Sequence, residues 1–302
     1  MSVYTDLKNN NIIGLTQRLL KAKIITQRDS DGKLAPNVMA QWDTPWVHVR
    51  QSYESNCFLW KTIIFEHIVK LNLPKEKWFV PVGCQDCWKV VVRPATLKQL
   101  FELEKLERRL NVPSKCGIET RPSVFGLYGG YFYNRGLENG LAKYKQVREA
   151  VNETLGEQIP VILKRGCTEM EHGVGPSNEW DVTEEQIRIE KMVVDRFVTD
   201  AQIIQQSEHA VDHVHQTWIE KAYQWGDPTV FEYLDEPLYP DYVTYHHLAE
   251  EDNATSRSGS CSSVDRQESS RSESRSQRRP DGRDKKAEGF DEIWSEADSE
   301  ES

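Results

Sequence analysis

The sequence predicts an α/β domain, with a long helical region at its C-terminal end and a disordered tail after it. Strand-like and helix-like segments alternate in β-α-β-α-β order between residues 78 and 180, which favours a partial or abbreviated (β/α) barrel with parallel strands. Hydrophobic residues make up 38% of the chain and include nine Trp, enough for a buried core. We therefore expect one domain over residues 1–245, with its metal-site region at 78–180, and a disordered tail over 246–302.

The N-terminal part of the domain is expected to contain two helices and one strand. Apolar spacing predicts a short amphipathic helix at 13–23, and Asp and Gly residues at 29–32 predict a turn. Residues 46–49 form a candidate strand. A second helix is expected at 57–71, ending before Pro74.

The first half of the metal-site region has the clearest pattern. Residues 89–93 form a short apolar strand. A helix over 96–110 follows, with Thr96 as its N-cap. A second strand is expected at 115–120.

The second half begins with a glycine-rich aromatic segment at 124–136, which we expect to be a loop. A helix at 137–155 and a third strand at 159–164 come next. A capping sequence then opens a long helical region at 183–225, which we expect to be broken. Residues 227–245, rich in Pro, Tyr and acidic residues, are predicted to be an irregular covering segment.

The charge of the chain implies no general electrostatic grip on nucleic acid, and it leaves a local basic groove as an open alternative. The net charge is −10, and residues 251–302, with 14 acidic and 9 basic residues, contribute half of it. No apolar run is long enough to span a bilayer, so we expect no membrane partner. The N-terminus lacks the pattern of a secretory signal. We therefore expect a cytoplasmic protein, in which cysteines serve as metal ligands or catalysts rather than in disulfides.

The tail ends in an acidic segment, 288–302, which has no basic residue but contains three large apolar side chains: Phe290, Ile293 and Trp294. This pattern resembles a short peptide that binds a protein partner. A purely solubilising tail is the alternative.

The cysteines are the strongest indication of chemistry. Cys84 and Cys87 have the two-residue spacing that lets two thiolates bind one metal atom or cluster. Cys116 and Cys167 lie next to predicted strands and complete a candidate ligand set. Cys57 is expected on the apolar helix. The alternative is that all of these are isolated buried thiols.

Two segments resemble strand motifs of radical S-adenosylmethionine enzymes. Residues 117–122, Gly-Ile-Glu-Thr-Arg-Pro, resemble the "IETRP" strand of the Elongator catalytic subunit and its relatives. Residues 163–177 resemble the next strand region of that group, which reads approximately "L..GCT..E.GVQS". The residues that match the second motif are Gly166, Cys167, Thr168, Glu171, Gly173, Val174 and Ser177.

The resemblance implies a [4Fe–4S] cluster held by three thiolates, with S-adenosylmethionine bound at the remaining iron. The family motif is CxxxCxxC, whereas here Val80 occupies the first position. A third ligand is therefore needed besides Cys84 and Cys87. It would have to be Cys116, Cys167 or Cys57, and we expect Cys116 first and Cys167 second.

The same resemblance suggests roles for residues around the cluster. Glu119 and Arg121 would contact the cofactor from a strand end, although an ordinary ion pair is the alternative. Glu171 and His172 are candidate catalytic residues. Two glycines suit close backbone approach to the cofactor: Gly129 and Gly130.

The resulting hypothesis is a radical isomerase that needs an electron donor. Its substrate would be DNA or a modified nucleotide, and the rearranged group would be an amino-acid adduct on a modified thymine. The main alternative is a non-enzymatic protein in which the cysteines hold a structural zinc and the tail recruits a partner. A third possibility is a cysteine-dependent transferase without a metal.

Overall fold

The computed structural model describes residues 12–37, 45–54, 57–71, 73–122, 124–239 and 245. The chain divides into two compact units, Met1–Pro240 and Asp241–Ser302. The predicted tail, with its acidic end, lies outside the described residues. Within them, no helix is both long and apolar enough to cross a membrane.

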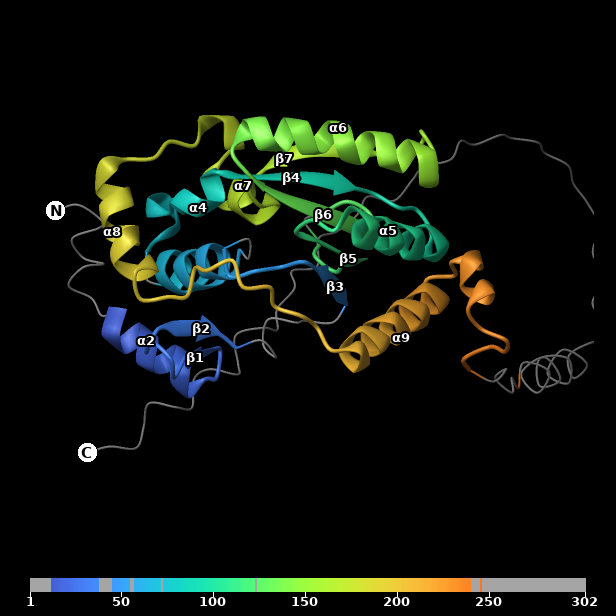
Figure 1. Cartoon of the computed structure of the whole chain (residues 1–302), viewed down its shortest axis with the longest axis horizontal. Helices are drawn as coiled ribbons and strands as arrows, with labels where there is room; N and C mark the ends of the chain where they lie inside the picture. Colours follow the sequence, from blue (N-terminus) through green and yellow to red (C-terminus); the bar gives the residue numbers. More distant parts are fainter. Residues whose placement is uncertain are drawn as a thin grey trace, which may run out of the picture. The chain divides into compact units, whose positions relative to one another are not determined.

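A five-stranded sheet forms the centre of the first unit, and the predicted mixture of strands and helices is confirmed (Figure 1). The strand order is β3-β5-β6-β4-β7, and every neighbouring pair is antiparallel. The predicted parallel sheet is therefore wrong. Among the described residues the sheet is open, with edge strands β3 and β7, and it does not close into a barrel. The strands are β3 (Trp46–Val49), β4 (Cys87–Val92), β5 (Ser114–Ile118), β6 (Tyr128–Arg135) and β7 (Val161–Arg165).

Strand β6 explains why the prediction failed, because it occupies the segment that we expected to be a loop. Its sequence, YGGYFYNR, alternates between the two faces of the sheet, but two adjacent glycines hide the alternation. With β6 included, the order becomes β-α-β-β-α-β. Strands joined by a helix do run in the same direction, but a third strand lies between each such pair. This is the split β-α-β, or ferredoxin-like, topology, a name that carries no functional meaning.

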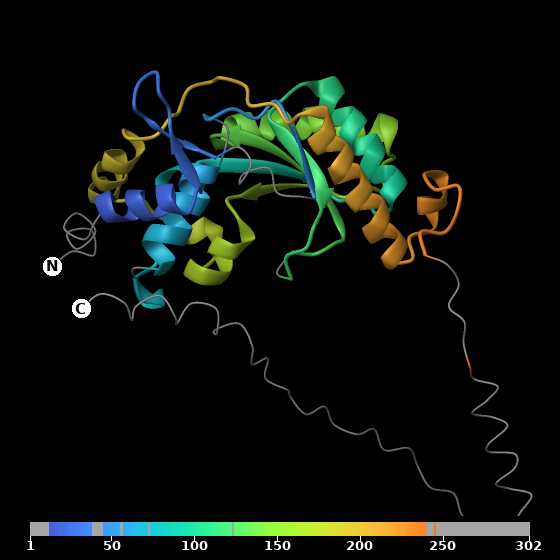
Figure 2. The same cartoon turned by 90° about the horizontal axis from the view of Figure 1, so that it is seen from below.

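Three helices cover one face of the sheet: α5 (Leu97–Leu110), α6 (Leu137–Thr154) and α9 (Glu208–Gln224) (Figure 2). The predicted N-cap of α5 is confirmed, since the Thr96 side chain accepts a hydrogen bond from the Gln99 amide at 3.3 Å. Apolar side chains from the helices and strands form the main core, and its fully buried members include Val90, Leu103, Phe132, Val147 and Trp218.

A second, smaller core joins the N-terminal elements to α8 (Glu184–Val194). The predicted turn at 29–32 connects the strands of a hairpin. The predicted helix at 57–71 is present as η1, which has the wider winding of a π-helix. The elements that contribute are α2 (Ile12–Lys21), β1 (Ile25–Gln27), β2 (Leu34–Pro36) and η1 (Leu59–Lys70).

The expected long helical region consists of α8 and α9, each preceded by a side-chain N-cap, Thr183 and Ser207 respectively. The expected break lies between the two helices. In the following segment, η4 (Pro228–Glu232) packs on α5, and the Asp227 carboxylate accepts a hydrogen bond from the Leu97 amide at 2.6 Å.

Candidate functional site

The face of the sheet opposite α5, α6 and α9 carries the polar and reactive side chains. Because successive strand residues point to opposite faces, Lys89, Lys115 and Tyr131 lie on this second face, whereas Val90 and Cys116 lie in the main core. Three short elements approach the second face together with η1. They are α4 (Val82–Gln85), α7 (Thr168–Val174) and η3 (Ser177–Glu179).

Four cysteines from separate elements line one cavity, which we call the cysteine pocket: Cys57, Cys84, Cys87 and Cys167. Cys57 precedes η1, Cys84 lies in α4, Cys87 begins β4, and Cys167 precedes α7. The Gly166 amide donates a hydrogen bond to the Cys87 carbonyl at 2.8 Å, which ties the last two elements together.

Two glycines allow the walls of the cysteine pocket to pack closely. Gly166 has a φ of 60°, and a Cβ atom there would lie 2.5 Å from the Trp180 ring. A Cβ atom on Gly83 would lie 2.1 Å from Trp60. A larger residue at either position would have to displace a tryptophan.

Three of the four cysteines predicted as ligands line this pocket. Cys84, Cys87 and Cys167 come together, but Cys116, our first choice as third ligand, does not join them. Cys116 is fully buried on the other face of β5, because its position in the strand alternation directs it under α5. Cys57, for which we favoured simple packing on a helix over a role as third ligand, lines the pocket.

The thiols of the cysteine pocket differ in their tendency to ionise. Burial raises the pKa of Cys84, and it raises the pKa of Cys87 to about 11. Burial acts in the same direction on Cys167, but the charges of Lys89 and Lys61 outweigh it and lower the pKa of that thiol. The Lys89 ammonium group lies 2.9 Å from the Cys167 sulfur. Cys167 thus ionises more readily than Cys84 and Cys87.

A second cavity adjoins the cysteine pocket and shares Cys57 and Cys167 with it. We call it the cationic cavity, because six of its lining residues are basic and none is acidic. The basic residues are Lys61, Lys89, Arg93, Lys115, Arg121 and Lys164.

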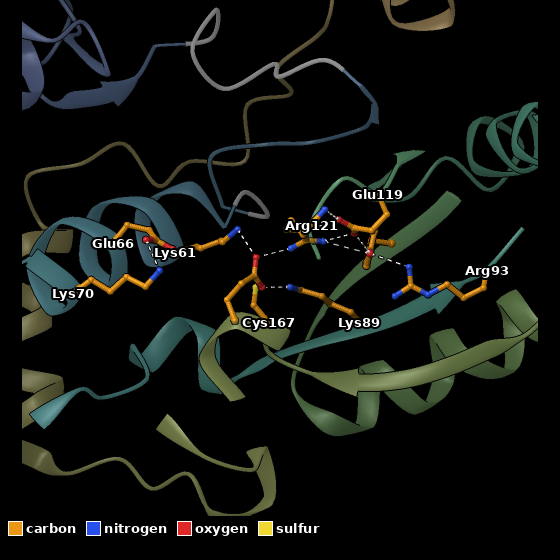
Figure 3. A network of polar contacts seen from close by, with 10 residues as sticks. Lys61, Glu66, Lys70, Lys89, Arg93, Glu119, Arg121 and Cys167 are labelled. Carbon is orange, nitrogen blue, oxygen red and sulfur yellow. Dashed lines mark hydrogen bonds and ion pairs between the residues drawn. The ribbon is translucent and has the colours of Figure 1, made fainter. Parts of the chain in front are cut away.

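An ion-pair network runs along the cationic cavity (Figure 3). Arg121 pairs with the buried Glu119 and, at 2.7 Å, with Glu169. Glu169 also pairs with Lys61 of η1 at 3.1 Å. The Tyr131 hydroxyl donates a hydrogen bond to Glu119 at 2.7 Å. Burial would raise the pKa of Glu119, but Arg121 and Tyr131 reverse that effect and lower it.

The network joins the two motifs of the radical-enzyme resemblance, although by an unexpected route. Strands β5 and β7 are not neighbours, and the pairing register puts their C-terminal ends at opposite ends of the sheet. Arg121, which follows β5, nevertheless reaches Glu169 of α7 across the second face.

The remaining predicted residues lie in different places. Glu171 forms an ion pair with Lys164, a lining residue of the cationic cavity. His172 is exposed and lines neither cavity. A Cβ atom on Gly129 would lie 2.9 Å from Arg93, and one on Gly130 would meet Leu103 of α5 at 2.5 Å. Gly130 therefore faces the main core, and the structure does not place it at a cofactor site.

Sequence reasoning did not include Lys89, Arg93 and Lys115 in the site. A signal for the first two was present, since they lie four residues apart in a strand with three valines between them. Residues at that spacing share one face of a strand, so a charged face was predictable.

The donor chemistry of the cysteine pocket fits a thiophilic metal or an iron–sulfur cluster, because both prefer thiolate ligands. Within the described part of the chain, no three His, Cys, Asp or Glu side chains already surround a single-ion position. Comparison with protein-family models, curated proteins and solved structures gives no match.

Proposed function

We propose that the protein is an iron–sulfur enzyme whose cluster is held by the cysteine pocket. The observation that carries this proposal is the convergence of four thiols from four separate elements on one cavity. When bound, such a cluster supplies single electrons to a substrate beside it. Binding would also release the protons that burial holds on Cys84 and Cys87.

The cationic cavity is the proposed place of reaction. It borders the cysteine pocket at Cys57 and Cys167, so a substrate there would be next to the cluster. The network also offers partners for the carboxylate of S-adenosylmethionine, because Arg121 and Lys61 both line the cavity.

We propose radical S-adenosylmethionine chemistry as the reaction class, and a rearrangement of an amino-acid adduct on a modified thymine as the reaction. This part rests on the two sequence motifs and on the contact between Arg121 and Glu169 that joins them. The fold does not support this reaction class, because the sheet of the described residues is antiparallel and lacks the parallel barrel of radical S-adenosylmethionine enzymes. A [4Fe–4S] cluster held by three thiolates leaves one iron open, so one of the four cysteines would not bind it. We expect that cysteine to be Cys57 or Cys167, because these two border both cavities.

Structural zinc is the second candidate, because four thiols are also a complete zinc ligand set. Anaerobic purification of the full chain, with analysis of iron, sulfide and zinc, separates the two. Iron with equimolar sulfide and a brown colour is expected. A colourless protein with one zinc would replace the enzyme proposal with the structural one.

Cysteine variants test the ligand set. Changing Cys84 and Cys87 to Ala together is expected to abolish iron binding. Cys116→Ala is the matched control, because its thiol lies on the other face of the same sheet, and it should keep the iron. Unchanged iron in a folded double variant would exclude the cysteine pocket as the cluster site.

Activity is tested with reconstituted protein, dithionite and S-adenosylmethionine, and the expected product is 5′-deoxyadenosine. Cys57→Ala and Cys167→Ala identify the unligated cysteine as the one whose loss leaves the iron in place. If the cluster is present but S-adenosylmethionine neither binds nor reacts, the radical chemistry is excluded and only the iron–sulfur assignment stands.

A further inference from the structure

The cationic cavity contains more positive charge than its own residues neutralise. Four of its six basic side chains have a partner: Lys61 and Arg121 pair with Glu169, Lys164 pairs with Glu171, and Lys89 contacts Cys167. Arg93 and Lys115 form no ion pair among the described residues, in a chain whose net charge is −10.

Arg93 and Lys115 both lie close to one aromatic ring, that of Tyr131. The Arg93 guanidinium lies 5.5 Å and the Lys115 ammonium 5.8 Å from the centre of the Tyr131 ring. Arg93 also donates a hydrogen bond to the Tyr131 hydroxyl at 3.1 Å, and Lys115 lies 4.1 Å from the centre of the Trp46 ring. Both side chains are partly exposed and line the cavity, so an incoming group can reach them.

We propose that Arg93 and Lys115 bind the phosphate group of a small phosphorylated substrate. Two unpaired cations match the double negative charge of a phosphate monoester, whereas a carboxylate would balance only one of them. The fork of a guanidinium also fits phosphate oxygens, and the ammonium adds a compact charge beside it. Burial lowers the pKa of Lys115 to about 8, and a bound phosphate would raise that pKa again by favouring the charged ammonium.

The ligand is inferred to be a free small molecule rather than duplex DNA. The unpaired cations line a cavity, and outside the tail the chain carries a net negative charge, which disfavours binding of a long polyanion. The phosphate also belongs to the substrate, because S-adenosylmethionine carries a positive sulfonium and no phosphate. This inference rests on the proposed function for the role of the cavity, and it adds the substrate class.

Calorimetric titration of the full chain tests the proposal with thymidine monophosphate, thymidine, inorganic phosphate, acetate and a thymine-containing oligonucleotide. Thymidine monophosphate is expected to bind on the order of tenfold or more tightly than thymidine. Inorganic phosphate should compete with it, and acetate should not. Equal affinity for thymidine, or competition by acetate, would overturn the phosphate assignment. Tighter binding of the oligonucleotide, with a steep salt dependence, would assign the site to DNA instead.

Two variants and a control locate the binding. Arg93→Gln and Lys115→Met should each weaken binding of thymidine monophosphate by on the order of tenfold, and Arg93→Lys should retain part of the affinity. Lys105→Gln is the control, since Lys105 is an exposed residue of α5 that pairs with Glu102 outside the cavity. Unchanged affinity in the folded Arg93 and Lys115 variants would contradict the proposal.

The titrations are carried out with reconstituted protein and with chelator-treated protein, so that the two proposals can fail separately. Phosphate binding that depends on Arg93 and Lys115, in a protein that takes up no iron on reconstitution, would leave this site standing and remove the iron–sulfur function. A protein that holds a complete cluster but binds thymidine monophosphate no more tightly than thymidine would keep the iron–sulfur function and remove the phosphate site.

Discussion

The two faces of the central sheet have opposite characters, although they are built from the same strands. Lys115 and Cys116 are adjacent in β5, yet Lys115 lines the cationic cavity and Cys116 is fully buried in the main core. Two buried glutamates show the same contrast. Arg121 and Tyr131 help to lower the pKa of Glu119 on the second face, whereas burial of Glu107, on the sheet-facing side of α5, raises its pKa well above its usual value. The first face supplies stability, and the second face carries the reactive groups.

The largest change in the free energy of unfolding is expected when a side chain in the main core is truncated. Phe132→Ala should lower the free energy of unfolding by roughly 3–5 kcal/mol, because it removes a fully buried ring and leaves a cavity. Its neighbour in β6 gives the matched comparison: Tyr133→Phe, on the second face, removes only a hydroxyl and should cost less than about 1 kcal/mol. Urea denaturation measures both. Similar losses in the two variants would mean that the faces do not divide their roles in this way.

The next largest effect is the pH dependence of stability caused by Glu107. Because its pKa is raised, the folded state keeps a proton on this carboxyl that the unfolded state releases. The stability contributed by this protonated group is present below pH 4.5, its ordinary pKa, and is lost as pH rises toward the folded pKa. The loss should be roughly 1.4 kcal/mol per pH unit in that window. Glu107→Gln should remove this slope, and unfolding experiments at pH 5, 6 and 7 measure it. An unchanged slope in the variant would show that Glu107 is ionised in the folded protein.

The sequence was sufficient to predict most single elements of the first unit. Thr96 and Thr183 were identified as helix starts because N-capping depends only on local hydrogen bonds. The pairing of the strands could not be predicted, because it depended on recognising β6 behind Gly129 and Gly130. Once that strand was missed, the order of helices and strands favoured a parallel sheet.

The site was predicted in part for a similar reason. The spacing of Cys84 and Cys87 is a local signal, and it identified the cysteine pocket correctly as a place where these thiols meet. The register of β5 directs Cys116 to the main core, whereas Cys57 reaches the pocket because the long-range packing of η1 places it there. Arg121 and Glu169 meet across a whole sheet face, a long-range contact that no local pattern encodes.

The smallest expected effect comes from Glu119, and it has the opposite pH dependence to that of Glu107. The ion pair with Arg121 lowers the pKa of Glu119 in the folded state, so its contribution is present above pH 4.5, the ordinary value, and is lost as pH falls through the folded pKa. Glu119→Gln should therefore lower the free energy of unfolding by roughly 1–2 kcal/mol at pH 7, and the difference from the native chain should shrink in acid.

The control for this prediction is Glu102→Gln, which breaks the exposed pair with Lys105 on α5 and should cost less than about 0.5 kcal/mol at either pH. Unfolding free energies of the three proteins at pH 7 and pH 3 test the prediction. If Glu119→Gln costs no more than the control at pH 7, the network on the second face contributes little to folding. Its charges would then serve only to hold Arg121 and Lys61 in place for a ligand, because an ion pair without net stability still fixes the positions of the groups that form it.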